Sequence, residues 1–270
     1  MIKSLALQIV FFCNIIGISI AQETDSIPKH DTFTIQSTHV AEERVINVWL
    51  PENYIESMSS FPTLYMADGG IEEDFPHVAN TLAKLIRENK IPPMILVGIQ
   101  NTQRRRDLTG KTTVERDKSI APIVGGAEKF RAFIEDELIP TIQNRYNTTD
   151  VRSIIGESLA GLFVVETLHE APELFDNYIA FDPSLCWNNS YLVTNATELL
   201  TKNTTSKKSL WFAGSNAKDI YKNTNKFAAT LKKINLSSIN WNYAAEPKLK
   251  HSTIFRATKE KALIWTFGKP

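Results

Sequence analysis

The segment over residues 154–163 constrains the fold of this chain more than any other. It reads Ile-Ile-Gly-Glu-Ser-Leu-Ala-Gly-Leu-Phe, so a short apolar run ends at Gly156, a polar pair follows, and an apolar helical pattern begins at Leu159. A buried strand that passes at once into a helix needs a very sharp turn. Such a turn accepts only small flanking residues, which Gly156 and Ala160 supply. The segment therefore predicts a strand–turn–helix unit with Ser158 at its tip.

This turn would present the Ser158 hydroxyl at the end of the strand, beside a helix N-terminus that favours developing negative charge. Ser158 is therefore a candidate nucleophile, with the Leu159 N–H as an oxyanion donor. The alternative is an ordinary serine helix cap.

The rest of the chain alternates apolar runs with longer helical patterns. Strands are expected over residues 44–50, 62–67, 94–99, 152–156, 177–181, 209–213 and 239–244. Helices are expected over residues 79–89, 129–146 (kinked near Pro140), 159–169, 224–234 and 258–267. This order predicts an α/β fold with a mainly parallel sheet and helices on both faces. We expect one domain over residues 30–270, preceded by a loose arm over 22–29, and a lid or binding loop over 103–126.

The first 21 residues are typical of a secretory signal peptide. Lys3 precedes an apolar run over residues 5–20, and Ser19 and Ala21 place small residues at a cleavage site after Ala21. We therefore expect an exported protein, periplasmic or secreted, without stable membrane insertion after cleavage. An uncleaved membrane anchor is the alternative.

Composition excludes several function classes. Lys plus Arg equals Asp plus Glu at 30 each, without the basic surplus of a nucleic-acid binder. Only Cys186 remains after cleavage at Ala21, which excludes an internal disulfide and a four-thiolate zinc site. No metal and no cofactor is expected.

A serine nucleophile needs a base, and the chain has five histidines. His30 and His39 lie near the N-terminus, and His169 is expected to face outward from its helix. His77 could line a pocket after the Asp-Gly-Gly turn at residues 68–70. His251 follows the last predicted strand and precedes the final helix, where a loop returns over the carboxyl edge of the sheet, and we predict it as the base.

The acid that orients His251 should follow the strand over 209–213. Asp219 is the carboxylate of that loop, although it could instead cap a helix. Glu246 and a Ser–His pair without an acid remain open. A second oxyanion donor is expected near Gly70, unless residues 68–71 form only an ordinary turn.

Several spaced segments together resemble the "putative esterase" family of α/β-hydrolases, which includes siderophore and feruloyl esterases. They lie at residues 61–69, 97–99, 104–109, 133–140, the turn at Ser158, 172–175, 182–188 and 250–253. The resemblance covers nearly all of residues 35–267. It implies the α/β-hydrolase fold, with Ser158 as nucleophile and His251 as base. Gly110 and Cys186 depart from the usual proline and second tryptophan, and the family's acid has no clear glutamate here.

These observations predict a serine carboxylic ester hydrolase that works through an acyl-enzyme on a small-molecule ester, with a siderophore ester among the candidates. Arg105, Asp107 and Trp187 would shape the pocket, although an Arg105–Asp107 ion pair and core packing of Trp187 are equally open. Acyl transfer to an alcohol and a non-catalytic exported binding protein are the alternatives.

Overall fold

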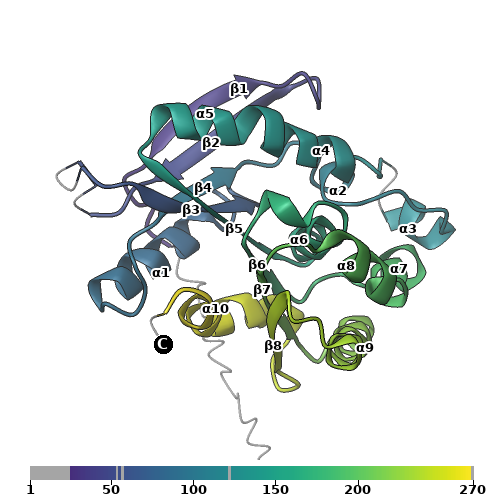
Figure 1. Cartoon of the computed structure of the whole chain (residues 1–270). Coiled ribbons are helices and arrows are strands. Elements are labelled where there is room, and N and C mark those ends of the chain that lie inside the picture. Colours follow the sequence, from purple (N-terminus) through teal and green to yellow (C-terminus); the bar gives the residue numbers. More distant parts are fainter. Residues whose placement is uncertain (1–24, 53, 56–57, 121–122, 269–270) are drawn as a thin grey trace, which may run out of the picture.

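The fold is built on one twisted sheet, seen in the computed structural model, which describes residues 25–52, 54–55, 58–120 and 123–268. Within these residues eight strands pair in the order β1-β2-β4-β3-β5-β6-β7-β8 (Figure 1). The strands are β1 (Asp31–Gln36), β2 (Glu43–Trp49), β3 (Phe61–Ala67), β4 (Ile95–Ile99), β5 (Thr148–Glu157), β6 (Asn177–Phe181), β7 (Lys208–Gly214) and β8 (Ile239–Ala245). β1, β2 and β4 pair antiparallel, and every pairing from β4 to β8 is parallel.

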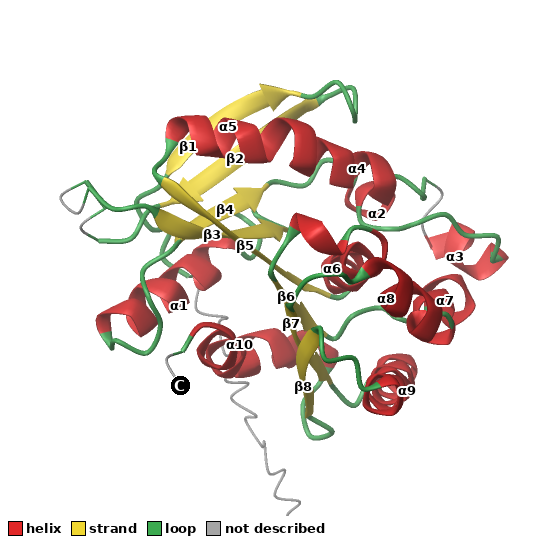
Figure 2. Cartoon of the chain, in the orientation of Figure 1, coloured by secondary structure: helices red, strands yellow, loops and turns green. Residues whose placement is uncertain are grey.

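Helices cover both faces of this sheet (Figure 2). The α-helices are α1 (Phe75–Arg87), α2 (Arg104–Asp107), α3 (Glu115–Ile120), α4 (Ala127–Phe133), α5 (Ile139–Arg145), α6 (Leu159–Glu170), α7 (Trp187–Thr194), α8 (Ala196–Asn203), α9 (Lys218–Ile234) and α10 (His251–Phe267). A π-helical turn, η1 (Ile134–Leu138), joins α4 to α5, and a 3-10 turn, η2 (Pro172–Leu174), precedes β6. The predicted α/β architecture, with a mainly parallel sheet between two helical layers, is therefore confirmed.

Two apolar cores lie on opposite faces of the sheet. One core packs α1 and α10 against the sheet, with Phe75, Leu82 and Phe255 among its buried side chains. The larger core packs α4 to α9 against the other face. Because the central strands contact helices on both faces, they carry almost continuous apolar runs, as parallel strands do.

Three of the predicted elements differ from the observed ones in an informative way. The helix expected over 129–146 is interrupted by η1, which ends two residues before Pro140, whose ring nitrogen cannot donate a helical hydrogen bond. The expected loop over 103–126 contains the short helices α2 and α3. The final helix begins at His251 rather than at residue 258, so His251 is helical instead of lying in the preceding loop.

The parallel strands end at one edge of the sheet, and strained backbone gathers there. Asp68, Ser158 and Asp182 directly follow β3, β5 and β6, and their φ angles are 56°, 58° and 44°. These values lie in the left-handed region, which costs a non-glycine residue about 1–3 kcal/mol. Because strained backbone clusters at functional sites, the three neighbouring strand ends indicate a functional site at this edge of the sheet.

The predicted signal peptide over residues 1–21 lies outside the described residues. The first described residues, 25 and 26, contact the layer formed by α1 and α10. Asp25 forms an ion pair with Arg256 at 2.6 Å, and the Ser26 carbonyl accepts a hydrogen bond from the Asn80 amide at 2.8 Å. Among the described residues, every helix is too short or too polar to cross a lipid bilayer.

Candidate active site

The turn between β5 and α6 has the predicted sharp geometry. Ser158 has φ 58° and ψ −114°, its N–H donates to the Phe181 carbonyl at 2.9 Å, and its carbonyl accepts the Leu162 N–H at 2.9 Å. A Cβ atom at Gly156 would lie 2.6 Å from the Ala160 carbonyl carbon, so a side chain does not fit there. The strain at Ser158 is thus fixed by β6 on one side and by α6 on the other.

His251 lies at the same edge of the sheet and is held by a carboxylate. Its Nδ1 is 2.8 Å from Asp182 Oδ2, and Asp182 is fully buried. The other carboxylate oxygen of Asp182 accepts the Ser215 N–H at 2.5 Å. Because the Ser158 N–H bonds to the residue that precedes Asp182, the structure brings Ser158, Asp182 and His251 to neighbouring positions. The Ser158 hydroxyl itself lies 3.4 Å from the Ser184 hydroxyl.

The carboxylate on His251 is therefore Asp182, which replaces the predicted Asp219. Asp219 lies in the first turn of α9, where its exposed carboxylate pairs with Arg116 at 3.2 Å. Glu246, the other candidate, accepts a hydrogen bond from Lys261 at 3.2 Å. The acid comes from the end of β6 rather than from the loop after β7, because His251 opens α10 and this helix packs on the β6–β7 part of the sheet.

The two predicted oxyanion donors differ in their availability. Leu159 is the first residue of α6, so its N–H has no partner inside the helix and lies beside Ser158. The Gly70 N–H instead donates to the Glu73 carboxylate at 2.7 Å. The Leu159 N–H therefore stays the predicted oxyanion donor, whereas the Gly70 N–H is engaged by Glu73.

Arg104, and not Arg105, reaches the site. Its guanidinium binds both oxygens of Asp68, at 2.5 and 2.7 Å. The hydrogen bond to Asp182 raises the pKa of His251, and the positive charge of Arg104 is one of the effects that oppose this rise. The neighbouring Arg105 is exposed and donates to the Ile120 carbonyl. Asp107 is buried and pairs with Arg44 at 2.8 Å and Arg106 at 2.6 Å, so the alternative of an Arg105–Asp107 ion pair is wrong, and Asp107 is held by two other arginines.

The two remaining internal histidines are structural. His77 is buried in α1, with Asp74 Oδ1 at 2.9 Å and Lys259 Nζ at 3.1 Å, so it is not exposed to a ligand. His169 was expected to face outward, but it is fully buried and its Nδ1 bonds to the Val165 carbonyl at 2.7 Å. Burial lowers the pKa of His169 to about 4, which keeps this imidazole neutral.

Two groups at the site have perturbed pKa values. The hydrogen bond to Asp182 raises the pKa of His251, and burial opposes this effect. Glu157, directly before Ser158, has a pKa raised to about 7 because it is largely buried. An imidazole held by a carboxylate, beside a carboxyl group that changes charge near neutral pH, suits general acid–base chemistry.

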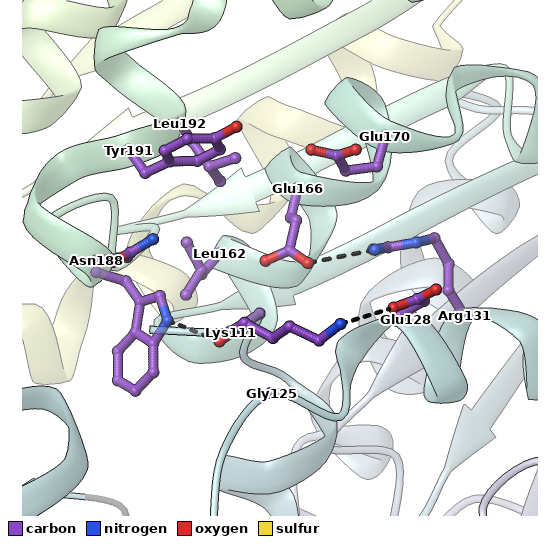
Figure 3. Close-up of a pocket in the computed structure, with 12 residues that line it drawn as sticks. Lys111, Gly125, Glu128, Arg131, Leu162, Glu166, Glu170, Asn188, Tyr191 and Leu192 are labelled. Atoms are coloured by element: carbon purple, nitrogen blue, oxygen red, sulfur yellow. Dashed lines mark hydrogen bonds and ion pairs between the residues drawn. The ribbon is translucent and has the colours of Figure 1, made fainter. Parts of the chain in front are cut away.

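A cavity of about 520 Å³ lies along one side of α6, where Leu162, Glu166 and Glu170 line it (Figure 3). Its lining includes Leu162, one helical turn after Ser158, and Trp187, whose indole N–H donates to the Gly110 carbonyl at 3.1 Å. The Arg131–Glu166 pair, at 3.2 Å, and the Lys111–Glu128 pair, at 3.6 Å, add charge to the same cavity. Trp187 is thus largely buried and also lines this cavity, and its predicted role in shaping a substrate pocket stays a prediction.

Sequence reasoning missed Asp182, Arg104 and Glu157. A signal for Asp182 was present, because Asp182 directly follows the predicted strand over 177–181 and so belongs to the same carboxyl edge of the sheet as Ser158. Arg104 and Arg105 are adjacent in sequence, and no local pattern distinguishes which of them faces inward.

Comparison with known proteins agrees with this architecture. The family model described as "Putative esterase" matches residues 37–245. The ferri-bacillibactin esterase BesA of Bacillus subtilis is 29% identical over 190 residues, covering 60% of this chain and 64% of the relative. The siderophore triacetylfusarinine C esterase of Aspergillus fumigatus is 36% identical over 98 residues, which cover 34% of this chain and 32% of the relative. The matched part therefore spans less than two thirds of the length of these relatives.

Solved structures share the fold. An IroE-like serine hydrolase from Shewanella oneidensis superposes with a TM-score of 0.81 at 27% identity, covering 88% of this chain and 79% of that structure. The siderophore hydrolase EstB from Aspergillus nidulans superposes with a TM-score of 0.71 at 18% identity, covering 90% and 95%. The fold is the α/β-hydrolase fold, as predicted.

Proposed function

The chain belongs to the esterase family of α/β-hydrolases, and we propose that it is a serine carboxylic ester hydrolase with Ser158 as nucleophile, His251 as base and Asp182 as the acid that orients the base. One observation carries this assignment. The His251 Nδ1–Asp182 Oδ2 contact of 2.8 Å lies at the strand edge that also holds the strained Ser158. A buried carboxylate on one imidazole nitrogen leaves the other nitrogen free to accept a proton.

In the proposed mechanism, Ser158 Oγ attacks the acyl carbon of the ester while His251 Nε2 takes the hydroxyl proton. The Leu159 N–H stabilises the oxyanion that forms, and the positive charge of Arg104 lies nearby. The imidazolium then gives its proton to the leaving alcohol, and the ester C–O bond breaks to leave an acyl-enzyme. Water, deprotonated by His251, hydrolyses that intermediate and releases the acid.

We further propose a siderophore-type ester as the substrate class. The support is that BesA and the fusarinine esterase, both similar to this chain, are named for such substrates. The cavity lined by Leu162 and Trp187 begins one helical turn from Ser158 and is the proposed binding place for part of the ester. We also propose export, with residues 1–21 as a cleaved signal peptide and residues 30–270 as one hydrolase domain.

The test uses the protein from residue 22 onward. We expect hydrolysis of a short-chain aryl ester and of a triscatecholate lactone, and stoichiometric labelling of Ser158 by a serine-directed phosphonate, located by mass spectrometry. Ser158→Ala should abolish both turnover and labelling while the circular dichroism spectrum is retained. Turnover that survives this substitution would refute the serine mechanism, and product that appears only with an added alcohol would indicate acyl transfer.

A further inference from the structure

Glu157 is the last residue of β5 and lies directly before the proposed nucleophile. In the parallel register, Glu157 pairs with Phe181 and Ile155 pairs with Ile179. The side chains of Ile155, Ile179 and Phe181 belong to the core beneath α1 and α10. Because alternate residues of a strand share a face, the Glu157 side chain points toward the same layer as Ile155. This is the layer in which α10 begins at His251.

The carboxyl group of Glu157 therefore lies among the charged groups at the edge of the sheet. On its two sides in the sheet are the ends of β3 and β6, which carry Asp68 and Asp182. Five charged or titratable groups interact electrostatically with Glu157. They are Asp68 after β3, Asp74 directly before α1, Arg104 in α2, Asp182 after β6 and His251 in α10. Lys259 of α10 contacts His77 instead, with its Nζ 3.1 Å from His77 Nδ1.

We propose that Glu157 is a positioning residue that supplies a second negative charge beside the His251 imidazole, in addition to Asp182. This inference rests on the proposed serine hydrolase function. When Ser158 gives its proton to His251, an imidazolium forms, and a nearby carboxylate stabilises that cation. Asp182 fixes the tautomer through its hydrogen bond, whereas Glu157 acts through its charge alone.

The electrostatics of the site are consistent with this role. Burial raises the pKa of Glu157 to about 7, and the charge of Glu157 in turn contributes to the raised pKa of His251. The Glu157 carboxyl is therefore neutral in acid and ionised above about pH 7. Its help to the imidazolium grows as pH rises through that range, so the activity should depend on two linked protons rather than one.

The kinetic test is the pH profile of kcat/KM for an aryl ester in Glu157→Gln. Losing the carboxylate lowers the pKa of His251, so the acid limb should move to lower pH by about one unit, and the alkaline plateau should fall about tenfold. Glu157→Asp, which keeps the charge, should restore both. The matched control is Glu260→Gln, which removes an exposed carboxylate from the same helix as His251 and should leave the profile unchanged. An acid limb that stays in place in folded Glu157→Gln overturns the proposal.

A second measurement is independent of turnover and of the stability of the variants. The C2–H resonance of His251, assigned by its absence in His251→Asn, is followed by NMR as the wild-type protein is titrated. Two inflections are expected, because Glu157 and His251 titrate together, and a single inflection contradicts the proposal. Failure of Ser158 labelling would refute the serine hydrolase function, whereas loss of the second inflection with labelling intact would refute only the role of Glu157.

Discussion

The most discriminating perturbation is Asp182→Asn. Asp182 is fully buried, one of its oxygens accepts the Ser215 N–H, and the other is 2.8 Å from His251 Nδ1. Asparagine has the same shape, and its carbonyl oxygen can keep the bond to Ser215. Its NH₂ group then faces His251 Nδ1, which must become an acceptor. The proton of the imidazole moves to Nε2, the nitrogen that should receive the Ser158 proton.

The size of the effect follows from this geometry. His251 is partly exposed, so an effective dielectric constant of about 20 is appropriate, and at about 4 Å a unit charge stabilises an imidazolium by about 4 kcal/mol. Losing that stabilisation slows the reaction about a thousandfold. The wrong tautomer adds to this loss, so we expect kcat/KM to fall about 10³- to 10⁴-fold.

The assay is aryl ester hydrolysis on the alkaline plateau, together with the rate of phosphonate labelling of Ser158. The control is Asp219→Asn, which removes an exposed partner of Arg116 and should change kcat/KM less than twofold, since such pairs contribute about 0–1 kcal/mol. If Asp182→Asn keeps a tenth or more of the activity while Asp219→Asn loses it, the assignment of the acid is wrong.

Two further predictions concern stability. The pKa of His169 is about 4 in the folded protein and has an ordinary value of 6.5, so the unfolded chain binds a proton on His169 first as pH falls. The free energy of unfolding should therefore fall by up to about 3 kcal/mol between pH 6.5 and 4. In a series of urea denaturations at different pH, His169→Leu should flatten this dependence. An unchanged slope would contradict the burial of His169. Gly156→Val places side-chain atoms within about 3 Å of Ala160 and should lower the free energy of unfolding by about 3 kcal/mol, measured by urea denaturation. The reverse substitution at an exposed position of the same strand, Val151→Gly, should lower the free energy of unfolding by about 1 kcal/mol or less. Comparable losses at the two positions would show that Gly156 is not sterically required.

The sequence predicted best where one local rule governs the structure. The sharp turn at Ser158 needs small neighbours and an apolar strand and helix, and these can be read from ten consecutive residues. The strand over 177–181 was predicted with its observed bounds for the same reason, because an apolar run of four residues, 178–181, between polar ones has few alternatives.

Prediction was weaker where a partner comes from a distant part of the chain. Asp182 and His251 are 69 residues apart, and their contact depends on where α10 begins. The helix was expected to begin seven residues later, which placed His251 in a loop and favoured a carboxylate after β7. His169 was misplaced because α6 is covered by other helices as well as by the sheet; its almost uninterrupted apolar sequence was the available sign of burial on every side.

The left-handed backbone at Asp68, Ser158 and Asp182 has a consequence for the evolution of this scaffold. Glycine would relieve each of the three conformations, yet the chain keeps side chains there. Selection for heat resistance alone would therefore favour glycine at these positions, and the three side chains would be lost as the melting temperature rose. In a thermostable descendant, the positions that still carry a residue other than glycine would thus show which of the three side chains its activity requires.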